Sequence, residues 1–213
     1  MNNRYSRKEE LANIITHGIG VVFGIVVFTV LLFSSLRKGD TISVVAFSIY
    51  GVCLIFMYLC STLYHSFRDE RIKNILRIFD HSSIYLFIAG TYTPVALLAL
   101  DGYLRVGIMI IVWIIAILGV IFKIVTAGKF DRYKALSLIT YIAMGWIAIF
   151  TIKPIINMTS LSFFMWILGG GIVYSLGTIF YSVRSIPYNH AIWHVFVLAG
   201  TILHFVGILL HLV

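Results

Sequence analysis

Hydrophobic residues dominate seven long stretches of this chain, and short polar segments separate them. The stretches cover residues 15–36, 42–64, 78–100, 106–125, 135–152, 163–181 and 191–213. Each is close to the ~20 residues that an α-helix needs to cross the ~30 Å hydrocarbon core of a bilayer. These helices and short loops use nearly all 213 residues. We therefore predict an all-α integral membrane protein, a single domain over residues 1–213 that forms a bundle of seven transmembrane helices.

The composition agrees with a protein whose solvent is lipid. Hydrophobic residues make up 61% of the chain, aromatic residues 15% and charged residues only 11%, and the mean hydropathy is +1.02. A soluble domain does not have this composition. The first stretch is too long for the apolar core of a signal peptide, and Glu9 and Glu10 precede it, so we expect it to remain as a helix. The expected location is the cell membrane, with multiple passes.

Basic residues lie mainly on one side of the predicted bundle. With seven spans, the N-terminus and the loops after the second, fourth and sixth spans share a side, which holds 12 of the 16 Lys and Arg residues. Because cytoplasmic loops are enriched in Lys and Arg, this split predicts a cytoplasmic N-terminus and an exterior C-terminus. The net charge of +8 is thus mostly a topology signal. It favours contact with anionic lipid head groups, and we expect no nucleic-acid partner.

Histidines at the ends of two predicted spans suggest a metal site. His65 ends the segment that begins at Ser61 in the second span, and His190 and His194 begin the seventh. The i, i+4 spacing places both polar residues of each motif on one face of a helix, one turn apart. An odd number of spans brings both motifs, and Asp80 of the third span, to the same cytoplasmic end, within ~10 Å of depth. The three imidazoles can therefore converge on one ion.

Three neutral imidazoles with one open position are typical of catalytic zinc, whereas structural zinc usually has four protein ligands. In such a site Asp80 can act as a general base, and Ser61 can orient a water or a substrate carbonyl. Simpler interpretations exist for each motif alone. The histidines can join helices by hydrogen bonds, Ser61 can bond the Met57 carbonyl, and Asp80 can cap the third helix. The combination favours the metal, because ionisable groups in membrane helices are costly and usually functional.

Three polar residues at the entrance of the first span follow i, i+4, i+8 spacing. They are Glu9, Asn13 and His17, at the same predicted depth as the histidine motifs. We expect them to support the site by hydrogen bonds, with an interfacial anchor as the alternative interpretation. None of the three is a predicted zinc ligand.

Two further histidines have less direct predicted roles. His81 points about 100° away from Asp80 around its helix, which favours an interfacial side chain. His204 lies ~15 Å of helical rise from His194, too far to join the site, so we expect it to pack or to line a cavity.

The same residues resemble the bacterial haemolysin III family, in the superfamily of progestin and adipoQ receptors. The matching segments are 9–17, 61–65, 80–94 and 190–194, and the similarity runs over nearly the whole chain. The resemblance implies seven helices with an intracellular N-terminus and a zinc ion held by His65, His190 and His194. It also assigns Asp80 and Ser61 to the water and the surroundings of that ion. Alkaline ceramidases, in the wider group, have a similar residue set, which implies hydrolysis of lipid amides.

Two classes of function stay open from the sequence. The first is a zinc-dependent hydrolase whose partner is a membrane lipid or fatty acid, cleaved at an amide or ester bond near the inner leaflet. The second is a cytolytic, pore-forming protein, the activity for which haemolysin III is named, or a receptor-like protein in which Zn²⁺ only holds helices together. A monomeric pore is disfavoured, because His204 and scattered Ser and Thr are the main polar groups at mid-membrane depth.

Overall fold

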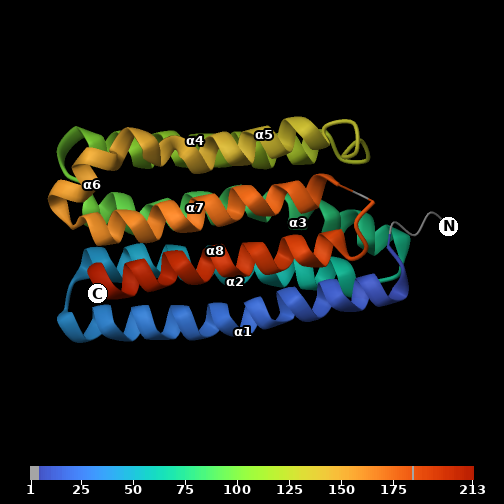
Figure 1. The fold of residues 1–213 in the computed structure, drawn as a ribbon, viewed down its shortest axis with the longest axis horizontal. Coiled ribbons are helices and arrows are strands. Elements are labelled where there is room, and N and C mark those ends of the chain that lie inside the picture. The colour runs from blue at the N-terminus through green and yellow to red at the C-terminus, as the bar shows by residue number, and fades with distance from the viewer. Residues whose placement is uncertain (1–4, 184) are drawn as a thin grey trace.

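In the described parts of the chain, seven helices are long and apolar enough to cross a membrane, and they form the bundle in Figure 1. The computed structural model describes residues 5–183 and 185–213, and it contains no strand in these ranges. The spans are α1 (Arg7–Lys38), α2 (Thr41–Ser66), α3 (Glu70–Ala99), α4 (Gly102–Val125), a fifth span over Lys134–Met158, α7 (Leu161–Ser182) and α8 (Asn189–His211). The predicted seven-helix architecture is therefore confirmed. Arg4 and Arg184, which entered the charge count, lie outside the described residues.

The fifth span consists of three pieces. They are α5 (Lys134–Gly145), the 3₁₀ helix η1 (Trp146–Thr151) and α6 (Ile152–Met158). The Tyr92 hydroxyl of α3 donates to the Gly145 carbonyl at 2.6 Å and accepts from the Ala148 N–H at 2.7 Å. These bonds satisfy backbone groups where the α-helical hydrogen-bond pattern ends. Inside a membrane, such groups need a partner from the protein. The hydrophobic pattern indicated only one apolar stretch over residues 135–152.

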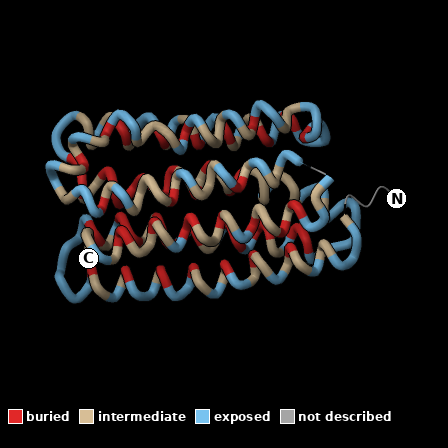
Figure 2. The backbone as a smooth tube through the Cα atoms, in the orientation of Figure 1, coloured by how far each residue is buried: buried red, intermediate tan, exposed pale blue. Residues whose placement is uncertain are grey.

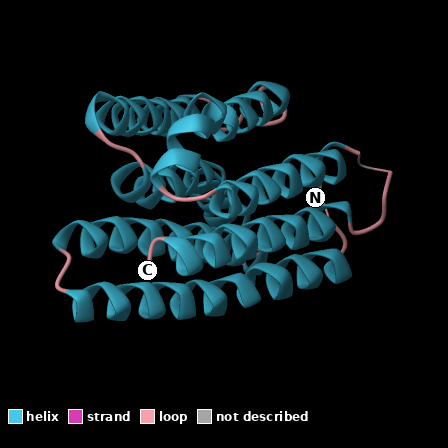
Figure 3. Ribbon diagram, turned by 60° about the vertical axis from the view of Figure 1, so that its left-hand side comes forward, coloured by secondary structure: helices cyan, strands magenta, loops and turns pink. Residues whose placement is uncertain are grey.

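Neighbouring helices in the sequence are mostly neighbours in space. Helix α1 packs against α2 and α8, α2 against α3, α3 against α4, and α7 against α8. Figure 3 shows that loops join the helices at the two ends of the bundle, and Figure 1 shows the start of α1 and the end of α8 at opposite ends. The end of α2 and the starts of α3 and α8 consequently meet at the end where α1 begins.

Capping residues fix where α1 and α3 begin. Ser6 and Glu9 form a reciprocal capping box at the start of α1. The Asp69 side chain accepts from two N–H groups in the first turn of α3. Asp80 lies a further ten residues along α3, so it is not the helix cap that one interpretation of the sequence suggested.

The buried face of α1 follows a spacing of three and four residues, which Figure 2 shows as a stripe facing the other helices. The stripe contains two glycines, Gly20 and Gly24. A Cβ atom at Gly20 would lie 2.2 Å from the Tyr58 ring of α2. The absence of a side chain at this position therefore allows α1 and α2 to approach closely about two helical turns from His65.

We predict that Gly20→Ala destabilises the protein, whereas Gly18→Ala does not. The methyl group at position 20 must displace the buried Tyr58 ring, and overpacking of this kind costs ~1–3 kcal/mol. At Gly18 the same atom meets nothing within 4 Å, so only the better helix propensity of Ala acts there. Thermal unfolding of both variants in the same detergent measures the difference. Equal melting temperatures would show that the close contact at Gly20 is unimportant.

The charge split and the odd number of spans predict that the N-terminus is cytoplasmic and the C-terminus exterior. Fluorescent-protein and alkaline-phosphatase reporters fused to each end test this arrangement. We expect fluorescence only at the N-terminus and phosphatase activity only at the C-terminus. If the same reporter is active at both ends, the two ends lie on one side of the membrane, which would contradict the topology and the cytoplasmic placement of the histidines.

Candidate metal centre

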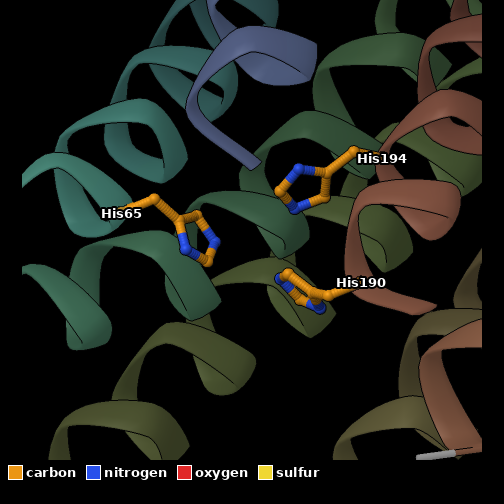
Figure 4. A group of neighbouring side chains, drawn as sticks. All are labelled: His65, His190 and His194. Atoms are coloured by element: carbon orange, nitrogen blue, oxygen red, sulfur yellow. The ribbon is translucent and has the colours of Figure 1, made fainter. Parts of the chain in front are cut away.

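Three histidine side chains converge near the start of α1, as Figure 4 shows. His65 lies in the last turn of α2, and His190 and His194 lie in the first two turns of α8. One candidate ligand nitrogen from each ring lies within 4.8 Å of the other two. His65 and His194 are 3% and 1% exposed, and His190 is half-buried. The structure thus brings together the three residues that the sequence predicted as ligands, in a group that could hold a metal ion.

The start of α8 has an unusual backbone. Tyr188 has φ 57° and ψ 21°, the only positive φ of a non-glycine residue in the described parts of the chain. This left-handed conformation costs such a residue ~1–2 kcal/mol. The Glu9 carboxylate accepts from the Tyr188 N–H at 3.4 Å, and the Tyr5 ring stacks on the His190 ring with centroids 5.2 Å apart. Contacts from the N-terminal segment therefore help to hold the first turn of α8, which carries His190.

The surroundings of His65 leave one of its nitrogens available. Nδ1 lies 2.6 Å from a carboxylate oxygen of Glu10 and 3.4 Å from the side-chain amide of Asn13. Because a carboxylate only accepts hydrogen bonds, Nδ1 carries the proton and donates to Glu10. Nε2 is buried and has no hydrogen-bond partner among the described residues. A buried nitrogen with a free lone pair is costly, and a bound metal ion would satisfy it, so His65 fits a ligand role.

The surroundings of His194 have the same effect. The Thr16 hydroxyl lies 3.1 Å from His194 Nδ1 and 2.8 Å from the carbonyl oxygen of Ala12. When the hydroxyl proton goes to that carbonyl, the hydroxyl oxygen accepts from Nδ1–H of His194. The lone pair of His194 then lies on Nε2. The donor set, with two rings held in this tautomer, fits a metal ion.

The supporting residues in α1 differ in part from those expected. Of Glu9, Asn13 and His17, only Asn13 brings a polar side-chain group close to a ring nitrogen of the cluster in the described chain, with its amide nitrogen 3.4 Å from Nδ1 of His65. Glu9 contributes to the cap of α1, and His17 stacks on the second α8 histidine, with ring centroids 3.4 Å apart. The hydrogen bonds expected of those two residues come from the adjacent Glu10 and Thr16. Adjacent residues differ by about 100° around a helix, and the spacing within α1 does not say which of them faces α2 and α8.

A cavity of about 200 Å³ ends at the histidines. Its polar end includes Ser61, Asp80, His190 and His194. Ser61 is buried and lies against the Asp80 carboxyl group, whose side chain is 13% exposed. The remainder is largely apolar and is formed by α3, η1, α7 and α8, with residues such as Phe87, Val95, Ile149, Phe164 and Ile167. The two predicted catalytic residues therefore share one cavity with two of the candidate metal ligands.

A second polar group lies on the other side of Asp80. His81 lines the cavity, and its Nε2 is 4.0 Å from the Asp80 carboxylate, so the expected interfacial position is wrong. Lys123 of α4 is 1% exposed, and its ammonium lies 3.5 Å from His81 Nδ1. It also donates to the Ser137 hydroxyl of α5. Lys123 was predicted only as one of the basic residues of the cytoplasmic side, although a lysine inside an apolar stretch is itself a signal of a functional or paired group.

His204 does not belong to the cluster, as the sequence predicted. Its ring lines the deeper part of the cavity, and its Nε2–H donates to the Ile167 carbonyl at 3.0 Å. A Cβ atom at Gly170 would lie 2.1 Å from this ring. His204 therefore packs closely against α7.

The fold and the site define a seven-helix membrane protein with a buried group of three histidines at one end. Comparison with known proteins agrees: the family described as haemolysin-III related matches residues 5–205. The chain is 44% identical to hemolysin-3 of Bacillus cereus, over 96% of this chain and 92% of that protein. It is also 44% identical to the hemolysin-3 homolog of Bacillus subtilis (strain 168), over 98% and 97% of the two chains. The chain belongs to the haemolysin III family.

The similarity extends beyond bacteria. The human monocyte to macrophage differentiation factor is 30% identical over 97% of this chain and 87% of its own length. Such mammalian relatives place the chain in the superfamily of progestin and adipoQ receptors. The resemblance stated from the sequence motifs is therefore confirmed, as is a multi-pass location in the cell membrane.

Proposed function

We propose that this protein is a zinc-dependent hydrolase that cleaves an amide or ester bond of a membrane lipid near the inner leaflet. The observation that carries the proposal is the shared cavity, in which His190 and His194 meet Asp80 and Ser61. A carboxylate and a hydroxyl beside a candidate metal centre are the groups that metal-assisted hydrolysis requires.

Zinc is the metal that best suits these ligands. Three neutral imidazoles, without thiolate or carboxylate in the group, are a ligand set that catalytic zinc sites use, with a fourth position left open. Bound zinc supplies Lewis acidity that polarises a carbonyl oxygen and activates water for attack. The three histidines of this chain hold the ion beside the polar end of the cavity.

The residues of the chain have distinct roles in the proposed reaction. Asp80 accepts a proton from the attacking water, whose oxygen forms a bond to the substrate carbonyl carbon. Asp80 then returns that proton to the amine or alcohol that leaves when the carbon–nitrogen or carbon–oxygen bond breaks. Ser61, against the Asp80 carboxyl, orients that group and the substrate carbonyl. The products are a fatty acid and the remaining amine or alcohol.

The cavity favours a lipid as the substrate. Beyond its polar end, mostly aliphatic and aromatic side chains line it, which suits an acyl chain and not a polar metabolite. The residues that line it belong to the membrane-spanning helices. An apolar lining also excludes bulk water, so the charges of the polar end act in a medium of low dielectric constant.

The first prediction of this proposal concerns metal content. The purified protein should contain about one zinc per chain, and His65→Ala, His190→Ala or His194→Ala should each lose most of it. His211→Ala is the matched control, because this histidine lies at the other end of α8 and contacts Ser160. Elemental analysis measures the ratio. Zinc-free wild type, or full retention in all three variants, would refute the proposed centre.

The second prediction concerns turnover. Asp80→Asn should reduce lipid hydrolysis by ~10²–10⁴-fold, the usual contribution of a general base, and keep its zinc. Ser61→Ala should lose less. Asp101→Asn, a change of the same kind at an exposed position outside the cavity, should keep full activity. The measurement is the release of fatty acids from a membrane-lipid extract. Undiminished release by Asp80→Asn would exclude the assigned role.

Membrane permeabilisation is the second candidate function, because the Bacillus relatives carry the name hemolysin. In this interpretation zinc only joins α2 to α8. Dye leakage from liposomes, followed in parallel with fatty-acid release, separates the two functions. Leakage that depends on zinc, proceeds without any released product and is equally strong in Asp80→Asn would favour permeabilisation over hydrolysis.

A further inference from the structure

Helix α1 provides no candidate metal ligand, yet it places three polar side chains against the histidine cluster. Glu10, Asn13 and Thr16 follow one another at intervals of three residues, which places them along one side of α1. All three contact a histidine of the cluster: Glu10 and Asn13 contact His65, and Thr16 contacts His194. The first three turns of α1 therefore border the histidine cluster.

Glu10 is held between two helices. One of its carboxylate oxygens accepts from Nδ1–H of His65 at 2.6 Å, and the other binds the ammonium of Lys73 in α3. Lys73 also lies 5.1 Å from the centre of the Tyr64 ring. A carboxylate fixed in this way holds the orientation of the imidazole and makes its second nitrogen a better electron donor.

Thr16 acts on the second ring by a different chemistry. Its proton goes to the backbone of the preceding turn of α1, so its oxygen can only accept from His194. The hydroxyl thereby selects the tautomer of His194 that has its lone pair on Nε2. The two contacts reach different rings through different functional groups, and both select Nε2 as the nitrogen that can bind a metal.

We propose that α1 sets the metal affinity of the site, with Glu10 and Thr16 as positioning residues for His65 and His194. The proposal rests on the proposed zinc centre. It adds Glu10 and Thr16, which have no part in the hydrolysis proposed above. Loss of such a partner typically weakens metal binding by ~10–100-fold. Lys73 acts only through Glu10, so removing its charge should have a smaller effect.

Zinc affinity tests the proposal without reference to turnover. Full-length protein in detergent is titrated with zinc against a chromophoric chelator. We expect Glu10→Gln to weaken binding by ~10-fold and Glu10→Ala by up to ~100-fold. Glu70→Gln is the matched control: this carboxylate is exposed in the first turn of α3, outside the histidine group and outside the cavity. Its affinity should remain within about twofold of wild type, which is less than any effect predicted for Glu10.

The Thr16 variants separate a positioning role from a packing role. Thr16→Val, which keeps the size of the side chain, should weaken zinc binding by ~10-fold, and Thr16→Ser should restore it because the hydroxyl returns. Thr29→Val is the control, since Thr29 is exposed in the same helix and bonds only the Ile25 carbonyl. The melting temperature of each metal-free variant, measured alongside, shows that the variant is folded.

The possible outcomes are distinct. Wild-type zinc affinity in Glu10→Gln, Glu10→Ala and Thr16→Val would overturn the inference and leave the zinc centre standing. Equal weakening in Thr16→Val and Thr16→Ser would also overturn it, because the hydroxyl would then have no role. A wild-type protein that binds no zinc would overturn the proposed centre itself. The inference about α1 is supported if Glu10→Gln and Thr16→Val bind zinc more weakly, Thr16→Ser recovers the affinity, and both controls keep the wild-type affinity.

Discussion

Each imidazole nitrogen that is buried inside a membrane bundle needs a partner, and the arrangement around the histidines follows from that need. His65 and His194 are almost completely buried, so neighbouring groups of the protein must supply most of their donors and acceptors. Helix α1 supplies Glu10 and Thr16, which requires α1 to pack against both α2 and α8. That packing in turn needs the small residues of its buried face, of which Gly20 meets Tyr58. The glycine contact and the polar contacts are thus two parts of the same helix interface.

The charged groups on the opposite side of the cluster obey the same constraint. Asp80 lies within the bundle, and the basic side chains of Arg77 and Lys123 lie near enough to interact with its carboxyl group. Lys123 reaches this position from α4 and bonds Ser137 of α5, so the polar group connects α3, α4 and α5. The fourth helix therefore contributes a basic group near Asp80 and the fifth a hydroxyl that binds it, although none of their residues belongs to the three-histidine group. The cavity lies between this group and the face supported by α1.

The sequence predicted the helices of this structure better than it predicted which face of each helix meets its neighbours. The length of the apolar stretches specified seven spans, and their odd number placed His65 at the same end as His190 and His194. The spacing within a helix says nothing about which face meets a neighbouring helix. For that reason Glu9 and His17 were expected where Glu10 and Thr16 are found, one position away in each case. The break at η1 was also missed, because it depends on the Tyr92 hydroxyl of another helix.

The broken fifth span explains how an apolar cavity and a polar centre coexist in a small bundle. An unbroken helix presents side chains at a constant angular interval, whereas the 3₁₀ segment η1 changes that interval from 3.6 to 3.0 residues per turn. Its residues Trp146 and Ile149 line the cavity, and the Trp146 indole donates to Ser175 of α7 at 3.0 Å. The wall opposite α3 is thus held by hydrogen bonds to single side chains and not by close helix packing. A wall of this kind leaves room for the cavity, while the tightly packed α1, α2 and α8 keep the histidines in place.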